Sequence, residues 1–258
     1  MKRIKKIDIF AILICFILYG YSIFIGAPIK DNTNIINLVV LGIFLVYVLV
    51  NVIKNKKYKL IRNNLDIFII ILVFSAYISL IFQNYANLEA TIEYIIKYTS
   101  ILCMYIMIRD IIKIDKRYSS YIISTLIISS ISIFLLGLDN LTFNYSKQFI
   151  ELTNNVNVEN GDKRFFGIFG YANTIAILML IISIITIGRY LESNKKQEKI
   201  IFNIVLLINI STIIMSYSRS TWIIALIVYL VYILFLKKED RIKYIELVIR
   251  IRNNKCSI

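Results

Sequence analysis

The chain has 258 residues, of which 59% are hydrophobic, with a mean hydropathy of +0.74 and a single proline, Pro28. A water-soluble domain of this size cannot bury so much apolar surface, and the dominance of Ile, Leu, Phe and Tyr excludes intrinsic disorder, collagen and a disulfide scaffold. The net charge of +14 is divided into short clusters between apolar segments, which is typical of membrane topology and not of nucleic-acid binding. The sequence therefore predicts an integral membrane protein.

Eight apolar segments are long enough, or nearly long enough, to cross a bilayer core of about 30 Å as helices. We expect an all-α, polytopic transmembrane bundle that covers residues 1–236, followed by a basic tail. The spans are predicted near residues 7–26, 35–53, 65–82, 91–108, 119–138, 168–188, 200–217 and 221–236. The first follows the basic stretch MKRIKK but lacks a small-x-small cleavage site, so it is interpreted as a retained helix and not as a signal peptide.

The positions of Lys and Arg predict which side each connection faces. When the connections are assigned alternately to two sides, 24 of the 30 basic residues fall on one side and five on the other, and Lys97 lies inside a span. By the positive-inside rule, both termini are predicted to be cytoplasmic.

Two polar segments lie outside the predicted spans. Residues 139–165 form the longest outer connection, are rich in Asn, and are expected to be an exposed loop. Residues 237–258 form a basic cytoplasmic tail that is too charged to span a membrane. Two interpretations of the tail stay open: an amphipathic helix on the inner membrane surface, with an apolar stripe that begins at Ile242, or a loosely ordered end held by anionic lipid.

Two arginines on the outer side lie where helices meet the interface. Arg164 begins the stretch RFFGIFGYANTIA at the entrance to the sixth span, and Arg219 lies in SYSRST, the tight turn between the seventh and eighth spans. A guanidinium group is a planar fork that suits phosphate oxygens, so two of them on one side of the membrane are suited to clamp a pyrophosphate. The simpler alternative is that each arginine reaches lipid headgroups or pairs with a nearby carboxylate or carbonyl.

Small and polar residues accompany both arginines. Gly167 and Gly170 allow a close backbone approach or an irregular helix entry, and Asn173 adds a polar group deeper in the sixth span. Ser218 and Ser220 flank Arg219, where their hydroxyls and the exposed amides at the start of the eighth span are suited to bind an anion.

These segments resemble the signatures of the O-antigen ligase and polymerase family of bacterial membrane glycosyltransferases, which join lipid-linked glycans on the outer side of the cytoplasmic membrane. The family's Arg-x-x-Gly-x-Phe segment, with a following Asn and small residue, resembles Arg164, Gly167, Phe169, Asn173 and Ala176. Its Ser-Arg-small segment at a helix start resembles Ser218, Arg219 and Ser220. The resemblance covers mainly residues 160–236.

The resemblance implies that Arg164 and Arg219 are catalytic, holding the pyrophosphate of a polyprenyl-linked glycan donor while a hydroxyl of a glycan or lipid acceptor attacks the sugar. It implies that the other substrate-binding residues are Gly167, Asn173, Ser218 and Ser220. Of these, Asn173 is expected to pack helices or to support the arginines. The chemistry needs no metal or other cofactor.

No other constellation predicts a metal or nucleotide site. Cys15, Cys103 and Cys256 are scattered, there is no histidine, and no Gly-rich nucleotide loop occurs. Glu93 and Lys97 are four residues apart in the fourth span, where a structural ion pair is favoured over a carbohydrate contact.

Two aspartates, Asp8 and Asp66, begin spans on the predicted inner side. They are interpreted as ordinary interfacial residues, on the wrong side of the membrane for the chemistry that the arginines suggest.

The sequence also departs from the family pattern. Family members are usually longer and have a later outer loop in which a histidine is proposed to activate the acceptor, whereas this sequence has no histidine. Because a positioned base contributes on the order of 10²–10⁴ in rate, we expect the chain alone to bind a donor and to transfer poorly. A truncated product, half of a split enzyme completed by a second polypeptide, and a diverged binding protein stay open, with truncation favoured by the charged ending.

Two other function classes compete with the transferase. One is a non-catalytic assembly subunit that passes the lipid-linked glycan to a partner. The other is a flippase or transporter of such lipids, which needs a membrane-depth cavity lined by polar groups.

Overall fold

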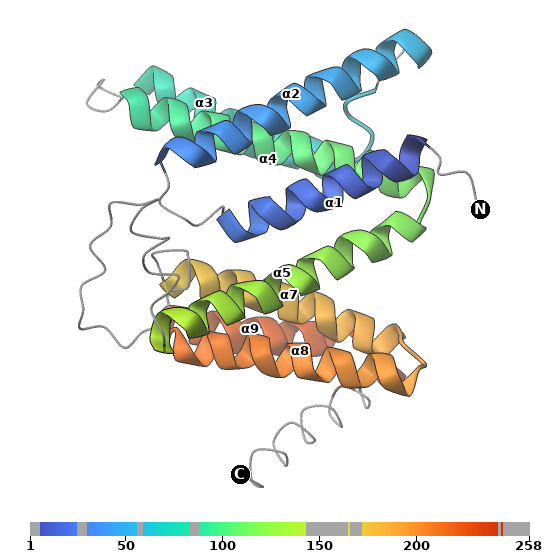
Figure 1. Ribbon diagram of the computed structural model, residues 1–258, viewed down its shortest axis with the longest axis vertical. Helices are drawn as coiled ribbons and strands as arrows, with labels where there is room; N and C mark the ends of the chain where they lie inside the picture. Colours follow the sequence, from blue (N-terminus) through green and yellow to red (C-terminus); the bar gives the residue numbers. More distant parts are fainter. Residues whose placement is uncertain are drawn as a thin grey trace, which may run out of the picture. The chain divides into compact units, whose positions relative to one another are not determined.

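The computed structural model describes residues 6–24, 30–55, 59–82, 88–142, 165, 172–241 and 244. These residues form helices and short connections, with no strand among them (Figure 1). The helices are α1 (Lys6–Phe24), α2 (Lys30–Asn55), α3 (Asn64–Phe82), α4 (Leu88–Ile114), α5 (Arg117–Thr142), α7 (Ala172–Glu192), α8 (Lys196–Met215) and α9 (Arg219–Phe235). A described helix overlaps each of the predicted spans, so the all-helical prediction is confirmed for this part of the chain.

Four of the described helices are long and apolar enough to cross a membrane, judged by length and composition: α2, α5, α7 and α8. Shorter apolar stretches lie in α1, α3 and α9. Large apolar side chains such as Phe16, Phe68 and Leu234 are exposed on these helices. A surface of this kind would associate in water but matches the hydrocarbon of a bilayer, so the chain is a helical membrane protein.

Some helices extend beyond the predicted spans. α4 continues past residue 108 to Ile114, and α5 continues to Thr142, into the segment predicted to be a loop. Polar residues at these ends are compatible with a helix because a helix satisfies its own backbone groups wherever it leaves the apolar layer. Residues 143–164 and 166–171 lie outside the described residues.

The chain divides into two compact units, which are described separately. Unit 1 comprises residues 1–17 and 29–122, and unit 2 comprises residues 18–28 and 123–258. In unit 1, α4 packs against α2 and α3. A buried hydrogen bond of 2.7 Å from Ser100 Oγ to Asn37 Oδ1 joins α4 to α2. Such a polar link between helices specifies their register within an otherwise apolar contact.

In unit 2, α7 packs along α8, and α9 contacts both (Figure 1). Only residues 193–195 separate α7 from α8, so the two helices are antiparallel. Ile127 of α5, Ile182 of α7 and Val205 of α8 form one buried apolar cluster. These contacts bring three helices together around a common interior.

The first residues of the predicted tail contact the helices of unit 2. Tyr244 is buried in a second cluster with Ile187, Tyr190 and Leu206. Arg241 Nη2 donates to carbonyl oxygens at the end of α9, on Leu234 at 3.2 Å and on Leu236 at 3.3 Å. The segment is therefore packed on the helices at Tyr244. The residues of the predicted apolar stripe, which begins at Ile242, lie outside the described residues.

Candidate functional site

The turn between α8 and α9 carries Arg219 and two of the serines predicted to bind substrate. α8 ends at Met215, and Tyr217 has a φ of 51°, in the left-handed region that residues with a side chain rarely adopt. Ser218 then caps α9, because its Oγ accepts the Thr221 N–H at 3.3 Å. The chain thus reverses direction within a few residues and presents the first turn of α9.

Hydroxyl groups fix the shape of this turn. Ser218 Oγ lies 2.6 Å from Thr221 Oγ1 and 3.3 Å from Ser220 Oγ. Ser216 Oγ donates to the Ile213 carbonyl oxygen at 2.7 Å and accepts the Ser218 N–H at 3.3 Å. The hydroxyls therefore hold one another and the backbone of the turn in place.

The exposed part of the turn has positive electrostatic character. Arg219 and Ser220 are the first two residues of α9, and both are exposed, whereas Ser218 is buried. The first N–H groups of a helix have no partner within the helix, and the helix dipole is positive at this end. The guanidinium of Arg219 adds a full charge to the same end. The arrangement is suited to an anion such as a phosphate.

The residue that follows Arg164 in the sequence is packed against this turn. The Phe165 backbone N–H donates to the Met215 carbonyl oxygen at 3.0 Å. The Phe165 ring is fully buried and stacks on Phe134 of α5, with ring centroids 5.9 Å apart. An ideal Cβ on Gly137 of α5 would lie 2.7 Å from Phe165 Cε2 and closer still to Cζ. The end of α5, Phe165 and the α8–α9 turn therefore meet within unit 2.

The predicted site residues fall into three groups. Ser218, Arg219 and Ser220 share the α8–α9 turn. Asn173, expected to pack helices or to support the arginines, is exposed in the first turn of α7, while Ala176 is fully buried there. The remaining members lie outside the described residues: Arg164, Gly167 and Phe169.

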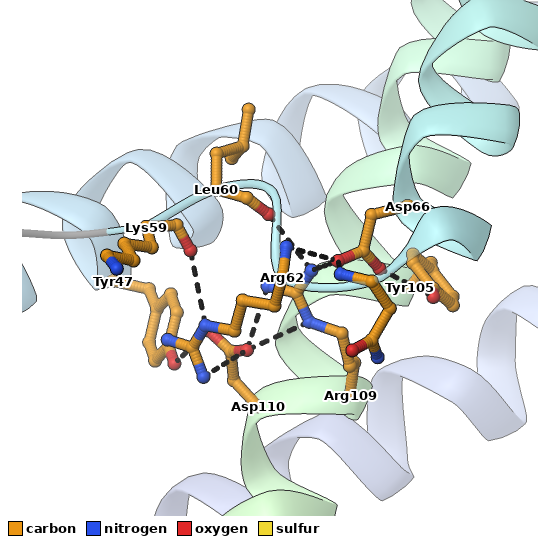
Figure 2. Close-up of polar contacts among 9 residues, drawn as sticks. Tyr47, Lys59, Leu60, Arg62, Asp66, Tyr105, Arg109 and Asp110 are labelled. Carbon is orange, nitrogen blue, oxygen red and sulfur yellow. Dashed lines mark hydrogen bonds and ion pairs between the residues drawn. The ribbon is translucent and has the colours of Figure 1, made fainter.

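Unit 1 contains a buried ion cluster, formed by Arg62, Asp66, Arg109 and Asp110, that sequence reasoning missed (Figure 2). The two carboxylates are 1% and 3% exposed. Arg109 pairs with both of them, with Nη1 at 2.6 Å from Asp66 Oδ2 and Nη2 at 2.9 Å from Asp110 Oδ1. Arg62 Nη1 lies 3.2 Å from Asp110 Oδ1. Two cations and two anions balance, so the cluster has no net charge.

The local sequence explains how Asp66 is held. It lies in the first turn of α3, where its Oδ2 accepts the backbone N–H of Arg62 at 2.7 Å and of Asn63 at 2.9 Å. A carboxylate at this position satisfies free amides and interacts favourably with the helix dipole. The Tyr105 hydroxyl of α4 donates to Oδ1 at 2.8 Å. Asp66 is thus fully partnered and cannot serve as a free base in this arrangement.

The cluster joins the ends of three helices. Arg109 Nη1 also donates to the Leu60 carbonyl oxygen at 2.9 Å, and the Tyr47 hydroxyl of α2 donates to Asp110 Oδ2 at 3.1 Å (Figure 2). Burial lowers the pKa of Arg109, but hydrogen bonds to Asp66 and Asp110 outweigh this effect and raise the pKa on balance. The guanidinium therefore stays charged. The role of this cluster is structural, since it fixes the α2–α3 connection against α4.

Comparison with known proteins identifies no relative, because no protein-family model, no curated protein and no solved structure matches the chain. Within the described part of the chain, no group of three or more Cys, Asp and Glu side chains is placed to hold a metal ion. The α8–α9 turn and its neighbours remain the part of the described chain whose chemistry suits a ligand.

Proposed function

We propose that the chain is a membrane glycosyltransferase of the O-antigen ligase or polymerase type, acting on polyprenyl-pyrophosphate-linked glycans at the outer face of the cytoplasmic membrane. The proposal is carried by the hydrogen bond from the Phe165 N–H to the Met215 carbonyl, which joins the residue after Arg164 to the turn that bears Arg219. In this proposal the chain crosses the membrane eight times with both termini in the cytoplasm, so that the α8–α9 turn faces outward.

The proposed chemistry is electrostatic. An acceptor hydroxyl oxygen attacks the anomeric carbon of the donor glycan and gives up its proton to water. The bond between that carbon and the phosphate oxygen breaks, and the polyprenyl pyrophosphate leaves with an added negative charge. Arg164 and Arg219 hold this leaving group and stabilise its charge, assisted by Ser218, Ser220 and the first amides of α9. Gly167 permits close approach of the backbone, and Asn173 supports the arginines.

The lack of histidine favours a second candidate, a non-catalytic subunit that binds the glycan lipid and delivers it to a partner polypeptide. An acceptor hydroxyl must lose its proton during transfer, and histidine is the side chain that most often accepts it. In both candidates the arginines bind the same pyrophosphate. Binding therefore tests the site, and transfer separates the two candidates.

The binding experiment uses the full chain in lipid nanodiscs with undecaprenyl pyrophosphate as the probe and native mass spectrometry as the readout. Arg164→Ala and Arg219→Ala are each expected to weaken binding by roughly 10- to 150-fold, the equivalent of one lost charge-assisted hydrogen bond of about 1.5–3 kcal/mol. Arg219→Lys keeps the charge but loses the two-pronged geometry, so it is expected to restore binding only in part.

The matched control is Arg189→Ala. Arg189 lies near the end of α7, away from the α8–α9 turn, and is paired with Glu192 at 3.3 Å. This variant is expected to bind the probe as the parent chain does. If Arg164→Ala and Arg219→Ala also bind normally, the proposed site is wrong. If binding follows the proposal but a glycan-loaded donor is not transferred to an acceptor alcohol, the subunit candidate is favoured.

A further inference from the structure

Buried hydroxyl side chains in the helices of unit 2 are satisfied within their own helices. Ser130, Ser183, Thr186 and Thr212 are fully buried, and each donates to a carbonyl oxygen three or four residues earlier, at 2.7–2.9 Å. This local bond lets a hydroxyl lie in an apolar interior at little cost. Such residues do not by themselves indicate a ligand.

Asn209 of α8 does not follow this pattern. It is fully buried, and neither its Oδ1 nor its Nδ2 has a hydrogen-bond partner among the described residues. An asparagine can bond to its own helix, as Asn51 does in α2, where Nδ2 donates to the Tyr47 carbonyl oxygen at 2.8 Å. Asn209 makes no such bond. A buried amide with both ends unpaired is costly and rare, and it calls for a specific explanation.

The opposing helix supplies apolar side chains at this level. Ile182 of α7 and Val205 of α8 share a cluster, and the two helices are antiparallel. Asn209 lies four residues after Val205 in α8. Because the helices are antiparallel, it is level with residues about four positions before Ile182 in α7, which are Leu178 and Met179. Both are apolar, and Met179 is fully buried. At this level α7 and α8 therefore supply no polar partner for Asn209.

A polar stripe connects Asn209 to the α8–α9 turn. Asn209, Thr212 and Ser216 are spaced i, i+3 and i+7, which places them on one face of the helix, and all three are fully buried. At a rise of 1.5 Å per residue, Asn209 lies about 10 Å along the helix axis from Ser216. The two hydroxyl oxygens each retain the capacity to accept another hydrogen bond while donating to their own helix.

We propose that Asn209 binds a hydroxyl group in the interior of unit 2, with Nδ2 donating a hydrogen bond to the hydroxyl oxygen and Oδ1 accepting a hydrogen bond from the hydroxyl O–H. An amide both donates and accepts, as a hydroxyl does. The bound group is neutral, because the stripe has no charge to balance an ion. The hydroxyl belongs either to a water molecule or to a membrane alcohol. This proposal does not depend on the arginines or on the proposed transfer reaction.

The test is NMR of the full chain in lipid nanodiscs, labelled with ¹⁵N on asparagine side chains. The signal of the Asn209 amide is identified as the one lost in Asn209→Leu, or in Asn209→Gln if the first variant does not insert. A water molecule at the site gives cross-peaks between the amide protons and water in the parent chain. A membrane alcohol gives a shift of the amide signal only when undecaprenol is added to the nanodisc.

A second readout is the unfolding temperature. If Asn209 binds a hydroxyl, Asn209→Leu removes two hydrogen bonds of the bound group, and the unfolding temperature is expected to fall by several degrees. If the amide is unpaired and dry, the same variant removes a buried polar group and the unfolding temperature rises. The control is Thr186→Val, which removes a fully buried hydroxyl of α7 that already donates to its own helix and is not part of the stripe. The proposal is contradicted if the amide shows neither water cross-peaks nor a shift with undecaprenol, or if the unfolding temperature of Asn209→Leu rises.

Discussion

Replacing Gly137 with alanine is expected to displace the Phe165 ring from α5. The added Cβ would lie 2.7 Å from Phe165 Cε2 and closer to Cζ, whereas ordinary carbon contacts begin near 3.4 Å. The ring must therefore move by about 1 Å, and it is fully buried and stacked on Phe134. Overpacking of this kind typically costs about 1–3 kcal/mol. Movement of the ring also strains the Phe165 hydrogen bond to Met215, which joins it to the α8–α9 turn.

The assay is denaturant-induced unfolding of the full chain in mixed micelles. Gly42→Ala is the matched control, because Gly42 also lies inside a helix and an added Cβ there meets nothing within 4 Å. The control is expected to stabilise the chain by roughly 0.5–1 kcal/mol through helix propensity. In a Phe165→Ala background the cost of Gly137→Ala should disappear. If Gly137→Ala is as harmless as Gly42→Ala in the parent chain, Phe165 does not occupy this position and the reasoning fails.

Three further changes test other parts of the structure. Asp66→Ala leaves the buried Arg109 with one carboxylate in place of two and is expected to cost about 3 kcal/mol in the same unfolding assay. The control, Arg117→Ala, removes an exposed ion pair with Asp115 and should cost less than about 1 kcal/mol. Tyr244→Ala removes a buried ring and is expected to cost about 3 kcal/mol and to speed proteolysis after residue 236. Ser218→Ala removes the cap of α9 and should cost about 1 kcal/mol, while Ser218→Asp should keep the stability but weaken undecaprenyl pyrophosphate binding by adding negative charge.

The positions of the helices could be predicted from the sequence because an apolar run of sufficient length is itself the physical requirement for a membrane helix. The ends were less predictable. Residues 139–142 are polar enough to suggest a loop, yet they continue α5. Hydropathy measures the preference of a segment for lipid, so it does not show where a helix ends. A helix that has left the apolar layer retains its backbone hydrogen bonds.

The ion cluster could not be predicted because its members are distant in the sequence. Asp66 and Arg109 are each ordinary for an interface, and only the packing of α3 against α4 brings their side chains to 2.6 Å. The adjacency of Arg109 and Asp110 in the sequence was only a weak indication of a buried ion cluster, since charged neighbours usually face water. The burial of Tyr244 was not predicted either, because the segment around it is highly charged.

Asn209 illustrates a different limit of sequence reasoning. A single asparagine in an apolar run looks the same whether it bonds to its own helix, as Asn51 does, or has no partner. The distinction depends on the side-chain rotamer and on the facing helix. By contrast, the Ser-Arg-Ser turn was predictable because its polar residues interrupt two apolar runs, which leaves room for only a tight connection.

The measurement that tests the central claim most directly is a double-mutant cycle on the affinity for undecaprenyl pyrophosphate. Dissociation constants are measured for the parent chain, Arg164→Ala, Arg219→Ala and the double variant. If both arginines hold one pyrophosphate, each single change weakens binding at least tenfold and the two losses are coupled by about 1 kcal/mol or more. Binding that is unchanged in either single variant, or losses that add within about 0.5 kcal/mol, would contradict a shared site.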